Sequence, residues 1–107
     1  MSETDALPIA CTLTDPELAR RAAAVREDLF AGAEGWEVLP DGYAIRFPGD
    51  AIWKERLDAF VTYERQCCAF LTFTLRFAPN AGPIWLSLTG PAGTKDFVRA
   101  QFLPEDA

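Results

Sequence analysis

Residues 51–77 read AIWKERLDAFVTYERQCCAFLTFTLRF, and the hydrophobic period changes within this stretch. Its first part repeats apolar residues every three or four positions, which predicts an amphipathic helix of about five turns. Its last part, residues 71–77, alternates apolar and polar residues, which is typical of a strand with one buried face. Pro48-Gly49-Asp50 marks the start of the helix. The segment therefore predicts a helix followed directly by a strand.

The same two patterns continue on either side of this segment. Alternation or turn residues predict four further strands, over residues 7–13, 36–39, 43–47 and 84–89. An N-terminal helix is predicted to begin at Thr14-Asp15-Pro16-Glu17, with Thr14 as the cap, and to end at Gly32. Arg26 is assigned to the solvent-exposed face of that helix. A last short helix follows Gly90-Pro91-Ala92-Gly93.

The order β-α-β-β-α-β-β-α predicts an α+β fold, with a mostly antiparallel sheet and helices packed on one face. The first six elements match a ferredoxin-like β-α-β-β-α-β core, to which a C-terminal strand and helix are added. With 107 residues the chain has the size of a single domain, so residues 1–107 are predicted to form one domain. Its ordered core is expected at about residues 7–103.

Charge and hydropathy exclude two classes of partner. The net charge is −6 and the ten basic residues form no stripe, so nucleic acid is not an expected partner. No apolar run is long enough to cross a bilayer, so no membrane association is expected. The N-terminus lacks the pattern of a secretory signal, which predicts a cytoplasmic location.

The chain contains no histidine and three cysteines, Cys11, Cys67 and Cys68. The absence of histidine excludes catalytic Ser/His and Cys/His pairs and the usual Cys/His zinc sites. In a reducing compartment the cysteines are expected to be free thiols. Chemistry must then depend on thiols, carboxylates, hydroxyls and the backbone.

Glu64 breaks the pattern of the central helix, because it falls in the middle of the apolar face. A buried carboxylate is costly unless it has a partner or is protonated. One interpretation is structural, an ion pair with an arginine or a hydrogen bond to a strand end. The other is functional, with Glu64 as a proton donor or acceptor one turn before Cys68.

Adjacent cysteines close the same helix. On a regular helix Cys67 and Cys68 diverge by about 100°, but at a helix end they could converge on one ion. Cys11, on the inner face of the first predicted strand, is either core filler or a third ligand.

The helix C-terminus and Glu64 both raise the pKa of a nearby thiol, so a permanently ionised, nucleophilic cysteine is not expected. Thiolates without histidine favour Hg(II), As(III) or Cu(I), and no other cofactor is implied.

The segment Glu64-Arg65-Gln66-Cys67-Cys68-Ala69-Phe70, with Leu86-Ser87-Leu88-Thr89-Gly90-Pro91 downstream, resembles a family of small, poorly characterised bacterial proteins. They share an E-R-x-C-C-x-F motif and a later L-x-x-x-G-P. The resemblance covers roughly residues 9–102, and members often have Pro in place of Ala69. Their genes often lie near mercury or arsenic resistance genes, which implies a detoxification role.

Three functional hypotheses follow. The first is a cytoplasmic soft-metal protein whose ligands are Cys67, Cys68 and Cys11, with Glu64 tuning protonation. The second is a thiol-dependent enzyme that cleaves a small organomercurial, with Cys68 and Cys11 holding the metal while Glu64 protonates the carbon. That set of groups resembles the one in alkylmercury lyases. The third is a structural module, such as a homodimer, in which the cysteines are core filler.

Overall fold

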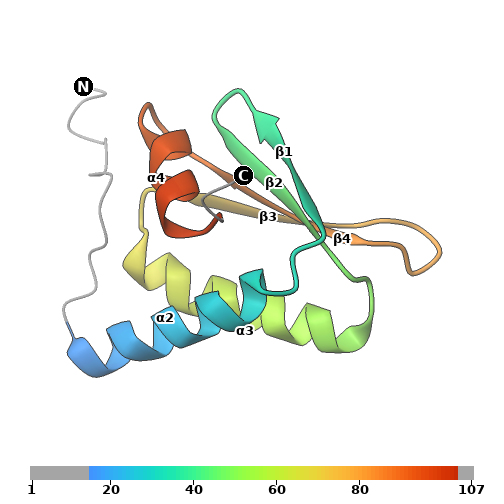
Figure 1. The fold of residues 1–107 in the computed structure, drawn as a ribbon, viewed down its shortest axis with the longest axis horizontal. Helices are drawn as coiled ribbons and strands as arrows, with labels where there is room; N and C mark the ends of the chain where they lie inside the picture. The colour runs from blue at the N-terminus through green and yellow to red at the C-terminus, as the bar shows by residue number, and fades with distance from the viewer. Residues whose placement is uncertain (1–14, 104–107) are drawn as a thin grey trace.

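The computed structural model describes residues 15–103, which form three helices and four strands (Figure 1). The predicted strand over residues 7–13, with Cys11, lies outside the described residues. In chain order the elements are α2 (Pro16–Phe30), β1 (Gly35–Leu39), β2 (Gly42–Phe47), α3 (Ala51–Cys67), β3 (Thr72–Phe77), β4 (Ile84–Thr89) and α4 (Thr94–Gln101).

The strands form one antiparallel sheet in the order β1-β2-β4-β3. This confirms the predicted α+β class with an antiparallel sheet. The ferredoxin-like order is not found in residues 15–103. That plan would place the strand predicted over 7–13 between β2 and β3, whereas here β4 lies there and pairs with both. Because only residues 78–83 separate β3 from β4, their pairing closes a short loop at little entropic cost.

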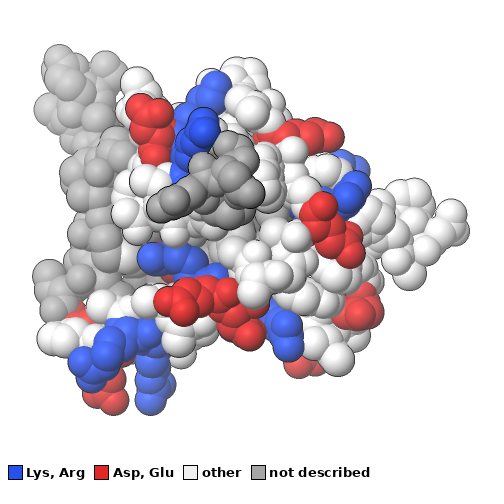
Figure 2. Space-filling model, viewed as in Figure 1, with Lys and Arg blue, Asp and Glu red and all other residues white. Residues whose placement is uncertain are grey.

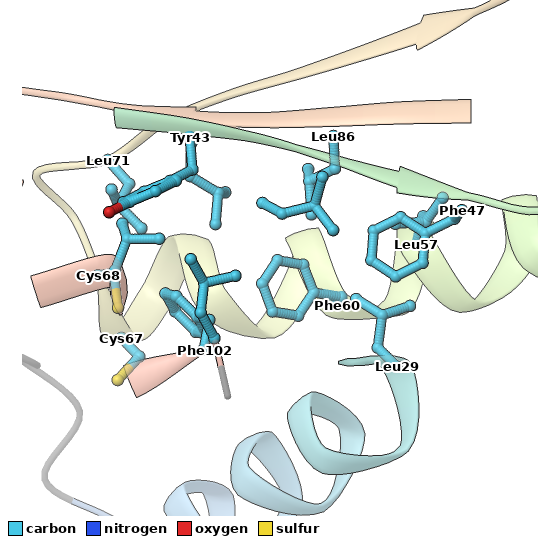
Figure 3. Close-up of a cluster of buried hydrophobic side chains, with 14 of the residues drawn as sticks. Leu29, Tyr43, Phe47, Leu57, Phe60, Cys67, Cys68, Leu71, Leu86 and Phe102 are labelled. Atoms are coloured by element: carbon cyan, nitrogen blue, oxygen red, sulfur yellow. The ribbon is translucent and has the colours of Figure 1, made fainter. Parts of the chain in front are cut away.

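All three helices lie on one face of the sheet, as predicted. Phe30 of α2 contacts the rings of Phe47 in β2 and Phe60 in α3. Phe102, which ends α4, contacts the rings of both Phe30 and Phe60. Figure 3 shows the side chains of Phe47, Phe60 and Phe102 between the sheet and the helices. The core of the described residues is therefore centred on an aromatic cluster.

Local signals place the elements close to where they were predicted. The Asp50 carboxylate accepts the Trp53 N–H and begins α3. The cap of α2 is Asp15, whose carboxylate accepts the Glu17 N–H, so the prediction of Thr14 is wrong by one residue. At the start of β2, a Cβ on Gly42 would collide with the Leu88 carbonyl oxygen in β4, so the close approach of these two strands requires glycine.

The opposite face of the sheet carries polar and half-exposed side chains. The guanidinium groups of Arg46 and Arg76 lie 5.9 and 5.7 Å from the ring centroid of Trp85, their cross-strand neighbour. Figure 2 shows acidic and basic side chains interspersed over the side of the molecule seen in Figure 1. Within residues 15–103, no helix has the length and apolar character needed to cross a membrane.

Candidate functional site

Glu64, Cys67 and Cys68 converge at the C-terminal end of α3. One ligand atom from each, a carboxylate oxygen and two sulfurs, lies within 4.8 Å of the other two. Glu64 and Cys68 are 0% exposed and Cys67 is 4% exposed. Figure 3 shows both sulfurs at this end of the aromatic cluster. The predicted grouping of these three residues is therefore present in space.

The end of the helix brings the two adjacent cysteines together. Cys67 is the last residue of α3, and Cys68 leaves helical geometry at φ −112° and ψ 72°. The Cys68 N–H still donates to the Glu64 carbonyl at 2.6 Å, while its own carbonyl accepts the Leu71 N–H. This turn keeps the Cys68 sulfur on the Glu64 side of the helix.

Glu64 has an arginine partner from the neighbouring helix. Nη2 of Arg26, in α2, donates to both carboxylate oxygens of Glu64 at 3.0 Å. The Arg26 side chain is only 19% exposed, and its guanidinium lies 5.0 Å from the Phe102 ring centroid. The assignment of Arg26 to the solvent-exposed face is therefore wrong. Its long side chain reaches back to the buried carboxylate, which confirms the ion-pair interpretation of Glu64.

The Cys68 thiol donates its S–H to Oε1 of Glu64, with a sulfur–oxygen distance of 3.4 Å. Burial, then the Glu64 charge and this hydrogen bond, raise the pKa of Cys68 from 9.0 to about 12, although the Arg26 charge acts in the opposite direction. The thiol is thus protonated at neutral pH. This confirms the prediction from sequence that Cys68 is not a permanently ionised, nucleophilic thiolate.

The raised pKa of Cys68 predicts a loss of stability in alkali. Above pH 9.0 the unfolded thiol ionises, whereas the folded thiol keeps its proton up to about pH 12, so stability falls as pH rises through this window. From pH 9 to about pH 10.5, this residue should lower the free energy of unfolding by about 2 kcal/mol. Denaturant unfolding of wild type and Cys68→Ala at several pH values measures this effect as a difference in how steeply the free energy of unfolding falls with pH.

The comparison isolates Cys68 because every other titrating group is present in both proteins. Cys68→Ala also removes buried volume, but that cost does not depend on pH. Parallel pH profiles for the two proteins would show that the Cys68 thiol titrates normally in the folded state.

The two cysteines differ in redox state. Cys68 is a free thiol, whereas Cys67 is disulfide-bonded. The expectation that all three cysteines are free thiols is therefore wrong for Cys67. A disulfide requires two sulfurs to approach in space, which sequence spacing does not reveal. Cys11, the third predicted ligand, lies outside the described residues.

This arrangement could hold a soft ion once Cys67 is reduced. Metal–thiolate bonds of about 2.3 Å place two sulfurs on one ion at most about 4.6 Å apart. The observed limit of 4.8 Å among the three ligand atoms is close to that distance. Cys67 and Cys68 would supply thiolates, and Glu64 would supply an oxygen ligand or accept a proton.

Arg26 is the residue of this site that the sequence-based reasoning missed. A signal existed, because Arg26 lies four residues after Ala22 and three before Leu29, both buried positions of α2. It therefore borders the apolar stripe rather than facing away from it. A buried acidic residue on one helix, together with a basic residue at the edge of another helix's apolar stripe, therefore predicts an ion pair between the two helices.

Comparison of the chain with protein-family models, curated proteins and solved structures finds no match.

Proposed function

We propose that this protein captures a soft metal ion of the mercury or arsenic type through Cys67 and Cys68, in the bacterial cytoplasm and in metal detoxification. The observation that carries the proposal is the convergence of two buried sulfurs and a buried carboxylate within 4.8 Å. Reduction of Cys67 precedes capture, because a disulfide sulfur is not a thiolate ligand. Cys11 is a candidate third ligand.

Metal binding at Cys68 exchanges a proton for the ion. At pH 7 a thiol with a pKa of about 12 is ionised in about one molecule in 10⁵. A bound cation supplies the positive charge that removes the proton. The Cys68 S–H already donates to Glu64, so that carboxylate lies where the departing proton goes. The protonated Cys68 thiol is therefore a poor nucleophile at neutral pH but can still bind a thiophilic cation.

The donor set decides which ions are favoured. Two sulfurs and one carboxylate, without histidine, suit soft ions such as Hg(II), As(III) or Cu(I) better than Mg²⁺ or Ca²⁺. Zn²⁺ prefers four ligands in structural sites, and these three residues provide one fewer.

Titration with Hg(II) or As(III) tests the proposal. Reduced wild-type protein should bind one equivalent, with a thiolate charge-transfer absorbance that saturates at that ratio. Protein that is not reduced should bind less, because Cys67 is disulfide-bonded. Cys67→Ser/Cys68→Ser should lose the saturable absorbance, and Cys11→Ser reports whether Cys11 contributes. The proposal fails if the double serine variant binds as tightly as wild type.

Two other hypotheses remain to be separated from metal capture. Cys67 and Cys68 belong to the hydrophobic core of the described residues, which favours a structural module as the second candidate. That hypothesis predicts no stoichiometric ion binding by reduced protein. Organomercurial cleavage requires Glu64 to donate a proton to carbon. Glu64 would have to pass to carbon the proton that Cys68 gives up, a further step that metal capture does not require.

A further inference from the structure

A cavity of about 300 Å³ lies beside the two cysteines, between α2, the end of α3 and α4. Its walls are formed by Ala19, Ala22 and Arg26 of α2, by Cys67 and Cys68, and by Phe97 and Gln101 of α4. A water molecule occupies about 30 Å³ in the liquid, and pockets for small organic ligands begin at about 300 Å³. The space next to the sulfurs is therefore much larger than a bare ion needs.

Most walls of this cavity suit an apolar group, and the guanidinium of the charged wall residue, Arg26, is bonded to Glu64. Ala19 and Ala22 contribute methyl groups from α2, and Phe97 contributes an aromatic ring from α4. That ring is fixed by edge-on contact with Phe70, at a centroid distance of 4.9 Å. Because Gln101 is exposed, its amide adds a polar group where the cavity meets solvent. A small hydrocarbon or aryl substituent would contact the apolar walls while its metal reached the thiol.

The redox difference between the cysteines points to the same class of ligand. Bare Hg(II) takes two thiolates, which requires reduced Cys67. A two-coordinate Hg(II) ion that already carries one carbon ligand needs only one further thiolate, and Cys68 is a free thiol. Cys68 could therefore bind such a cation while Cys67 is disulfide-bonded.

We propose that the physiological ligand is a two-coordinate soft metal cation of the Hg(II) type that carries one small apolar organic group, with its metal on Cys68 and that group in the cavity. This inference rests on the function proposed above. The exchange is R–M–X + HS–Cys68 → R–M–S–Cys68 + HX. The S–H bond breaks, the M–S bond forms, the leaving group X takes the proton, and nothing is oxidised or reduced.

Phenylmercury(II) and Hg(II) are the probes, and variants that fill the cavity are the test. Ala22→Leu places extra carbon atoms in the space that the phenyl group needs. It should weaken phenylmercury binding at least tenfold relative to Hg(II) binding, measured by competition against a small thiol on reduced protein. Ala19 is half-exposed and lines the same cavity, so Ala19→Leu also narrows it. This variant replaces Ala22→Leu in the affinity comparison if Ala22→Leu does not fold. Ala24 is exposed on the same helix, so Ala24→Leu should leave the ratio of phenylmercury affinity to Hg(II) affinity unchanged.

The unreduced protein gives a second readout. It should bind phenylmercury through Cys68, and Cys68→Ser should abolish this binding. An unchanged phenylmercury-to-Hg(II) ratio in both cavity variants would overturn this inference while leaving metal capture intact. If neither probe binds reduced wild type more tightly than Cys67→Ser/Cys68→Ser, the proposed function itself fails.

Discussion

Replacing Arg26 by methionine is expected to lower the free energy of unfolding by about 3–5 kcal/mol. The substitution leaves the fully buried Glu64 carboxylate without the guanidinium that donates to both of its oxygens. It also removes the contact between Arg26 and the Phe102 ring. Chemical denaturation at neutral pH measures the loss.

Two control variants separate the ion pair from other effects of this change. Arg21→Met, on the exposed face of the same helix, should change stability by no more than about 0.5 kcal/mol. Arg26→Met/Glu64→Met should recover most of the loss, because two packed apolar side chains replace a buried ion pair at little or no cost. A loss below about 1 kcal/mol for Arg26→Met would mean that this pair contributes little to holding α2 on α3.

Glu64→Gln is expected to make Cys68 more reactive by about tenfold at mildly alkaline pH. The carboxylate raises the Cys68 pKa through its charge and by accepting the S–H, so its removal should lower that pKa and increase the fraction of thiolate. The contribution of burial remains, so the pKa should stay above its ordinary value. The rate of iodoacetamide alkylation at mildly alkaline pH, followed by mass spectrometry of the Cys68 peptide, measures the change.

The matched control for this prediction is Glu55→Gln, an exposed carboxylate on the same helix, which should leave the Cys68 rate unchanged. Stability of each variant is measured in parallel, so that faster alkylation through unfolding is recognised. Equal Cys68 rates for Glu64→Gln and wild type would show that Glu64 does not control this thiol.

Most of the described fold could be predicted because its signals are local. The change of period at residues 51–77 predicted α3 and β3, and the patterns over residues 36–39 and 43–47 predicted β1 and β2. Strand order could not be predicted in the same way, since alternation shows that a strand has a buried face but not which strand lies beside it. The ferredoxin-like order therefore failed where β4 pairs with β2.

The site was predicted in part for a similar reason. Glu64 and Cys68 are one helical turn apart, so their proximity follows from helix geometry. Arg26 is 38 residues away from Glu64 in sequence and approaches it only when α2 packs on α3. The redox state of Cys67 likewise depends on a sulfur that is brought near by folding. Local spacing thus identifies the thiols but neither the counter-ion nor the disulfide.

The position of α2 as an outer layer has a kinetic consequence. Its C-terminal end is anchored in the aromatic core through Phe30, whereas its earlier turns border Cys67 and Cys68. Such a layer can detach in a sub-global opening that leaves the sheet intact. Amide hydrogens of α2 should then exchange with deuterium faster than those of β2 and β4. That opening would give a heavy atom a second route to the sulfurs, besides the cavity that meets solvent at Gln101.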